Sequence, residues 1–156
     1  MPFLQNTAAG TVNYTSGQLS SQLILPNDTA VNNSDTLVEV PEFTLAVAKY
    51  ERFIVNYNLF TTHNNTADIK VKVDVPASPT IYRAQLVSGG DEGTTTLTAE
   101  GDLALTTDTA NDIVTVKFLI QNGANAGNIV FSFAERDNSG AGVTLLGGSY
   151  AEYMRF

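Results

Sequence analysis

Residues 66–75 of the chain read TADIKVKVDV and alternate strictly between apolar and polar side chains. The apolar members are Ala67, Ile69, Val71, Val73 and Val75, and the polar residues between them are Asp68, Lys70, Lys72 and Asp74. A period of two places all the apolar side chains on one face of an extended strand, whereas a helix repeats every ~3.6 residues. This stretch therefore predicts a β-strand with one buried and one solvent-exposed face.

Most other segments repeat this pattern less regularly. The segments that we expect to form strands include 43–47, 50–60, 81–87, 113–120, 128–134 and 149–156. Clusters of Gly, Asn, Asp and Pro separate these segments and predict turns. About nine or ten strands at this spacing, without a convincing helix, predict an all-β fold. The simplest such fold is a two-sheet antiparallel sandwich of the jelly-roll type.

The first 35 residues differ from the rest. They are rich in Asn, Thr, Ser and Gly, and they contain only two short apolar patches, at 11–14 and 22–25. We interpret residues 1–35 as a polar N-terminal arm that becomes ordered by what it lies against, and residues 36–156 as the jelly-roll sandwich domain. The alternative is that this segment is an ordinary first strand with long loops.

The composition excludes several functional classes. The chain has 156 residues, no cysteine and a net charge of −8. Disulfides, thiolate metal sites and a cysteine nucleophile are therefore excluded, and an acidic chain is a poor ligand for nucleic acid. No apolar run is long enough to span a membrane, and the first residues lack the pattern of a secretory signal. We expect no nucleic-acid or membrane partner.

Few residues could carry catalysis. The single histidine, His63, lies in the sequence THNNT, where we expect a solvated turn. The acidic groups that could bind a cation or act in hydrolysis are Asp35 with Glu39, Asp91 with Glu92, and Asp108 with Asn111 and Asp112. Asp and Asn also stabilise turns through their own side chains, so the sequence at 108–112 fits both a turn and a calcium site. We expect no enzyme activity, no metal site and no cofactor.

The segment 149–156, SYAEYMRF, has apolar or amphipathic residues on both faces. Tyr150, Met154 and Phe156 share one face of the predicted strand, and Tyr153 and Arg155 share the other. Such a strand is either central in a sandwich or lies at a subunit interface, and interfaces favour Tyr, Met and Arg. The candidate interface residues are Tyr14, Leu23, Leu25, Tyr150, Tyr153, Arg155 and Phe156.

Two stretches resemble the jelly-roll virion proteins of tailed bacteriophages. In residues 43–76 an apolar strand is followed by a Tyr-led strand, a turn, an Ala-Asp-Ile-Lys strand and a proline. In residues 127–156 a Gly-led apolar strand ends in Phe-Ala-Glu, and a Gly-Ser-Tyr strand ends at an aromatic residue. The resemblance is to capsid decoration (cement) proteins and to the tips of head or tail fibres. It implies a β-sandwich, a homotrimer and a binding role without catalysis.

The arm favours the decoration role among these possibilities. A short polar arm on a compact domain fits a separate protein that docks on the outside of a phage head, where the arm would pair with a capsid strand. The expected partner is the major capsid protein. The expected location is the capsid surface of the virion, after synthesis in the host cytoplasm without a signal peptide.

Two alternatives remain at this point. The first is a receptor- or glycan-binding tip of a head or tail fibre, which would expose residues such as Tyr82 or those of the loop at 88–93. The second is a hydrolase that uses the scattered carboxylates. The sequence leaves open the capsid site, the copy number, the host and the choice between trimer and dimer.

Overall fold

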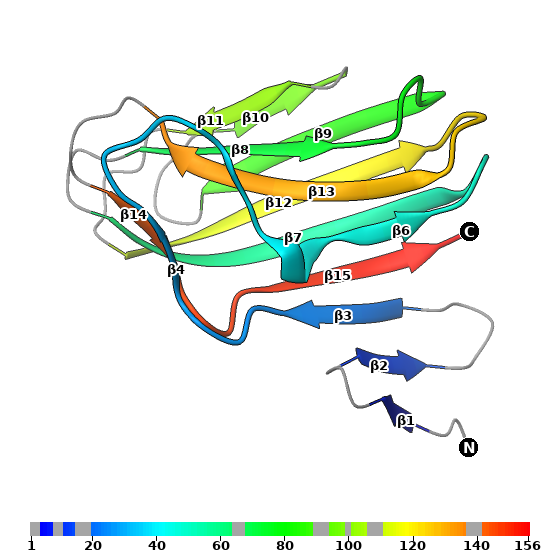
Figure 1. Cartoon of the computed structure of the whole chain (residues 1–156), viewed down its shortest axis with the longest axis horizontal. Coiled ribbons are helices and arrows are strands. Elements are labelled where there is room, and N and C mark those ends of the chain that lie inside the picture. The colour runs from blue at the N-terminus through cyan, green and yellow to red at the C-terminus, as the bar shows by residue number, and fades with distance from the viewer. Residues whose placement is uncertain are drawn as a thin grey trace.

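The computed structural model describes residues 4–7, 11–14, 20–63, 68–88, 94–98, 101–105, 111–136 and 142–156. The described residues from Ser20 onward form an all-β sandwich of two antiparallel sheets, as the alternation predicts, and residues 4–7 and 11–14 pair with each other as a separate two-stranded sheet (Figure 1). The strands are β1 (Leu4–Thr7), β2 (Thr11–Tyr14), β3 (Ser20–Ile24), β4 (Thr29–Val31), β5 (Val38–Glu39), β6 (Leu45–Val47), β7 (Arg52–His63), β8 (Ile69–Asp74), β9 (Ile81–Ser88), β10 (Thr94–Leu97), β11 (Asp102–Leu105), β12 (Asn111–Gln121), β13 (Gly127–Glu135), β14 (Val143–Leu145) and β15 (Tyr150–Arg155). A 3₁₀ turn, η1 (Pro41–Phe43), lies between β5 and β6. None of the described segments forms a helix long and apolar enough to span a membrane.

The order of the strands is that of a jelly roll. One sheet contains β3, β15, β7 and β12 in spatial order, and the other contains β5, β13, β8 and β11, with β6 also paired to β13. Chain segments alternate between the sheets, so that β7 lies in the larger sheet, β8 in the smaller, β12 in the larger and β13 in the smaller. The strands β9 and β10 extend the larger sheet beyond β12.

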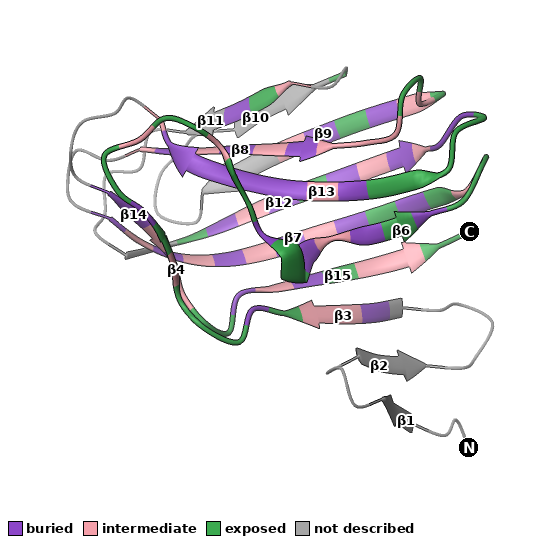
Figure 2. Cartoon of the chain, in the orientation of Figure 1, coloured by how far each residue is buried: buried purple, intermediate pink, exposed green. Residues whose placement is uncertain are grey.

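Strand β8, which lies within residues 66–75, has the buried and exposed faces that its alternation predicts. In β8 the side chains of Ile69, Val71 and Val73 are fully buried, and those of Lys70 and Lys72 are partly exposed. The same striping of buried and more exposed residues runs along β7 in the facing sheet (Figure 2). Each strand therefore contributes one face to a shared core and one to solvent.

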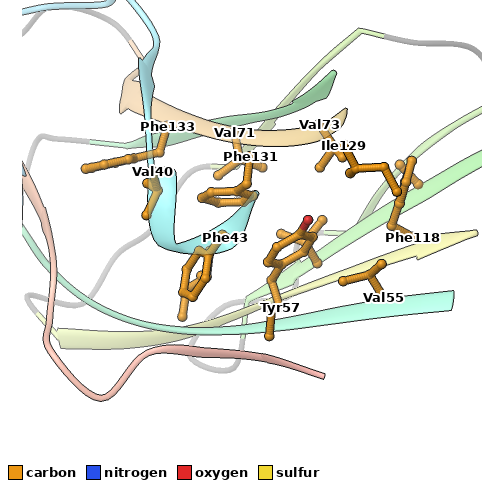
Figure 3. Packing of buried hydrophobic residues seen from close by; sticks show 14 of the residues in the cluster. Val40, Phe43, Val55, Tyr57, Val71, Val73, Phe118, Ile129, Phe131 and Phe133 are labelled. Atoms are coloured by element: carbon orange, nitrogen blue, oxygen red, sulfur yellow. The ribbon is translucent and has the colours of Figure 1, made fainter. Parts of the chain in front are cut away.

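Aromatic rings fill the centre of the core. Phe43, Tyr57 and Phe131 meet there, with ring centroids 5.7 Å apart for Phe43 and Tyr57 and 4.7 Å apart for Tyr57 and Phe131 (Figure 3). Phe43 comes from η1, whereas the sequence predicts a strand from residue 43. Pro41 accounts for the difference, because it has no N–H for a ladder and favours the first position of a helical turn. The ladder of β6 begins at Leu45.

The predicted strand at 50–60 also begins later than expected. Tyr50 has φ of +59° and a side chain that is 67% exposed, so it lies in a turn before β7. Its N–H donates to the carbonyl of Gly123 (2.9 Å). The buried Asn122 donates from its side-chain Nδ2 to the Ala48 carbonyl (2.8 Å) and to that of Asn125 (2.6 Å). These bonds tie the start of β7 to the turn after β12.

Two neighbouring chain segments of the larger sheet are interrupted at the same level. Residues 25–28 separate β3 from β4 in the outer segment, and residues 146–149 separate β14 from β15 in the segment between it and β7. Asp28 Oδ1 accepts a hydrogen bond from the Gly147 N–H (2.7 Å), and Ser149 Oγ accepts one from the Phe60 N–H (3.0 Å). Gly148 has φ of +92°, a backbone angle that residues other than Gly rarely adopt. The two breaks thus bond to each other and to β7.

Part of the predicted arm is integral to the sandwich. Residues 20–24 pair with β15 and residues 29–31 pair with β14. Leu25 and Val31 belong to the core, with side chains only 1% and 4% exposed. The boundary at residue 35 stays a prediction. Within the predicted arm, however, β3 and β4 both belong to the larger sheet.

We expect Ser149→Ala to lower the free energy of unfolding by about 1–3 kcal/mol, because the Phe60 N–H would lose its acceptor in a partly buried site. Urea denaturation measures the change. Ser34→Ala is the matched control, since Ser34 Oγ also accepts a backbone N–H, that of Thr36 (3.1 Å), but in an exposed position. Equal losses in the two variants would contradict this account.

The hydroxyl of Tyr57 generates a second prediction. It is buried and has no hydrogen-bond partner in the described part of the chain. Burial first, and the charge of Tyr82 second, raise the pKa of the Tyr57 phenol above its usual 10.0. The unfolded chain therefore releases this proton at lower pH than the folded chain, so stability falls as the pH rises above about 10.

We expect Tyr57→Phe to raise the free energy of unfolding by about 1 kcal/mol near neutral pH, because an unsatisfied buried hydroxyl is removed. The variant should also lose less stability than the unmodified chain above pH ~10. Thermal unfolding across this pH range measures both effects. Tyr50→Phe, at an exposed position, should change neither quantity, and a destabilised Tyr57→Phe would contradict the prediction.

Candidate functional site

The acidic groups singled out in the sequence do not form a site in the described residues. No group of three or more His, Asp or Glu side chains suited to a metal ion is found within the parts of the chain that the structure describes. Asp35 and Glu39 are exposed. Asp91, Glu92 and Asp108 lie outside the described residues, and so do the side chains of Asn111 and Asp112.

His63 differs from its expected environment. It is the last residue of β7 and its side chain is only 6% exposed, whereas the sequence predicts a solvated turn. The alternation of β7 explains the difference, because His63 follows Leu59 and Thr61 on the inward face. The strand therefore extends three residues beyond the predicted end at Phe60 and carries the imidazole into the sandwich.

The surface with the most unusual chemistry is the outer face of the larger sheet. We define this outer face by the described residues of β3, β15, β7, β12 and β9 whose side chains alternate with the buried ones. They are Gln22, Ile24, Tyr150, Glu152, Met154, Arg52, Ile54, Asn56, Asn58, Phe60, Thr62, Ile113, Thr115, Lys117, Leu119, Gln121, Ile81, Arg83 and Gln85.

The strand register arranges these residues in rows across the sheet. Met154, Ile54 and Leu119 are direct neighbours on β15, β7 and β12. The next row consists of Glu152, Asn56 and Lys117, and the row after it of Tyr150, Asn58 and Thr115. An apolar row is thus followed by a charged row and then by a mixed row.

Large apolar side chains on this face are exposed. Ile54 is 37% exposed, Ile24 49% and Ile113 53%. Phe60 and Tyr150 lie in ring contact, with centroids 6.4 Å apart. Contiguous apolar patches mark interaction surfaces in soluble proteins, and Ile54 lies in one row with Met154 and Leu119.

A depression of about 380 Å³ lies on the same face, over β7, β12 and β9. Ile54, Leu119 and Lys117 line it together with Arg83 and Gln85. Arg83 donates from Nη1 to the Tyr82 carbonyl (2.7 Å), so part of its charge is used within the chain. The site offers apolar contact and a few hydrogen-bonding groups, which suits binding.

The candidate interface residues of the last strand divide between the two faces as the alternation predicts. Tyr150 lies on the outer face, and Phe156 is 59% exposed after the end of β15. Tyr153 packs against the core. The Arg155 guanidinium lies over the rings of Phe53 (5.1 Å) and Tyr153 (5.6 Å) and pairs with Glu51 (3.6 Å). Arg155 therefore covers one end of the core.

The other candidates are placed differently. Leu23 is partly buried against the core, and Leu25 is buried within it, so Leu25 offers no side-chain surface to a partner. Tyr14 ends β2, and its side chain lies outside the described residues. Tyr82, expected to be exposed in a fibre tip, is only 4% exposed and donates its hydroxyl to the Val73 carbonyl (3.2 Å). Of the loop at 88–93, residues 89–93 lie outside the described residues.

Ile54, Leu119 and Ile113 are outer-face residues that the sequence reasoning did not select. The available signal was an apolar residue at a position where the alternation calls for a polar one. Each of the three interrupts the polar stripe of an otherwise regular strand.

Comparison with known proteins adds little to this description. No protein-family model and no curated protein match the chain. Among solved structures, the chain is similar to a chain from a structure of the infectious bursal disease virus Gt strain, with 10% sequence identity and a TM-score of 0.26. The match covers 99% of this chain and 46% of the viral chain, so this chain spans less than half of the length of the viral chain. A likeness at this level carries no argument about function.

Proposed function

We propose that this protein is a virion structural protein, a capsid decoration or cement protein that binds the outer surface of a phage head and stabilises contacts between capsomers. The observation that carries the proposal is the jelly-roll sandwich whose N-terminal strand β1 has one edge without a partner strand among the described residues. The resemblance of residues 43–76 and 127–156 to phage virion proteins supports it. The partner is the major capsid protein, and no bond is made or broken.

The N-terminal strands offer the means of attachment. β1 pairs with β2 on one side, and no second partner strand is found for β1 within the described residues. An edge of this kind presents backbone N–H and C=O groups that an exposed capsid strand can pair with. Binding by backbone pairing tolerates the polar composition of this segment, because the main chain supplies the affinity.

The acidic charge suits a protein displayed at high density on a particle. The net charge of −8 would add negative charge to each decorated head, and like-charged particles repel one another in solution. The homotrimer implied by the resemblance would place three attachment strands on one assembly, and multivalent attachment raises avidity without any new contact.

We expect the double variant Gln5→Pro/Asn6→Pro to lose binding to undecorated heads by at least about tenfold. The N–H groups of adjacent residues point to opposite edges of a strand, so one proline removes a donor from the free edge of β1 and the other removes a donor from its ladder with β2. Co-sedimentation of the purified protein with undecorated heads measures this binding. Gln5→Ala/Asn6→Ala is the matched control, since it removes the same side chains but keeps both N–H groups.

The outcomes separate the elements of the proposal. Loss in the proline variant alone supports attachment through β1. If the unmodified protein fails to sediment with heads, the decoration role is wrong, and binding to cells or polysaccharide would then point to a fibre tip. Equal binding by both variants would retain decoration but exclude β1 as the attachment strand.

A further inference from the structure

The charged row of the outer face carries opposite charges on opposite sides of β7. Glu152 on β15 and Lys117 on β12 are both register partners of Asn56. Both side chains are exposed, and neither forms an ion pair within the described part of the chain. Their backbones lie two strand spacings apart, about 10 Å. Each charge is therefore available to an external partner at the same level along β7.

The apolar row next to it is balanced about β7 in the same way. Met154 on β15 and Leu119 on β12 flank Ile54. On the far side of the charged row, Tyr150 and Thr115 flank Asn58, and Phe60 pairs with Ile113. In each of these rows, the residue of β15 on one flank of β7 and the residue of β12 on the other flank are thus similar in polarity. In the charged row the two residues have opposite charges.

Copies of the chain can bring these matching flanks together if they are related by a rotation axis that lies in front of this face and runs parallel to β7. Such an axis brings the β15 flank of one copy against the β12 flank of the next without a shift along the strands. Glu152 then meets Lys117 of the next copy, and Met154 meets its Leu119, while Ile54 of every copy faces the axis. Closed rings of this kind are the usual symmetry of soluble homo-oligomers.

The charge of the face also favours a second copy of the chain as the occupant. Of the 16 acidic residues in the chain, Glu152 is the only one among the described outer-face residues, where Arg52, Lys117 and Arg83 supply positive charge. Two chains with a net charge of −8 repel each other over most surfaces. The described part of this face carries none of that acidic excess, so the repulsion between two acidic chains is weaker where these faces meet.

We infer that the chain forms a closed homo-oligomer through the outer face of its larger sheet, with the rotation axis parallel to β7 and an ion pair between Glu152 and Lys117 of adjacent copies. Complementary charges at an interface set its register and disfavour other partners. The inference rests on this chain's own sheet and does not depend on the decoration role. Two or three copies satisfy the same register, and the native mass gives their number.

Charge exchange tests the register. The native mass and dissociation constant are measured by light scattering and sedimentation for Glu152→Lys, Lys117→Glu and the double variant. Each single variant should raise the dissociation constant by at least about tenfold, because like charges then face each other. The double variant restores the pair with reversed polarity and should return the dissociation constant to within about threefold of the original.

Lys49→Glu is the matched control for net charge. It makes the same change in charge as Lys117→Glu, but Lys49 lies exposed in the turn between β6 and β7. It should leave the dissociation constant unchanged. Ile54→Asp tests the apolar row at a side chain that is 37% exposed, and it should yield folded monomers, with folding checked by thermal unfolding.

A monomeric native mass for the unmodified chain would overturn the inference, whatever its binding to heads. Folded single variants that both dissociate but are not restored by the double variant would overturn the pairing of Glu152 with Lys117. An oligomer that tolerates Ile54→Asp would place the contact on another surface. Because the mass is measured without heads, failure here is distinguishable from failure of the decoration role.

Discussion

The structure depends on the burial of one face of β7. Its inward side chains, among them Phe53, Val55, Tyr57 and Leu59, are fully removed from water. The strand pairs with β12 on one edge and with β14 and β15 on the other. Because the side-chain period of a strand is two, burial of these residues also decides which residues point outward, and a slip of one position would exchange the two sets. The core and the candidate interface are therefore two consequences of one constraint.

The fold was predictable from the sequence because alternation is a local signal. The ten residues that begin at Thr66 contain the pattern that β8 displays, and no distant contact is needed to read it. The errors occurred where a local signal was ambiguous or misread. Pro41 began a 3₁₀ turn within a segment predicted to lead into a strand, Tyr50 adopted a positive φ, and His63 continued β7 where a polar sequence resembled a turn.

The candidate site could be predicted only in part, because it depends on strand register. The outward position of Tyr150 and Met154 follows from the alternation of one strand. The alignment of Glu152 with Lys117 across Asn56 does not, since it requires the pairing of β15 and β12 with β7. Residues separated by 35 positions in the sequence share a row only after the sheet has formed. The core position of Leu25 likewise depends on the pairing of β3 with β15.

The pairing of β15 between β3 and β7 has a consequence for synthesis. Strand β3 begins at Ser20 and β7 ends at His63, but the strand that joins them is made of Tyr150–Arg155. While the chain emerges from the ribosome, β3 and the facing edge of β7 thus stay open until these late residues appear. Folding that waits for such distant segments is slow, and open strand edges invite aggregation. Nascent chains that have not yet reached β15 therefore expose two strand edges that the folded sheet pairs.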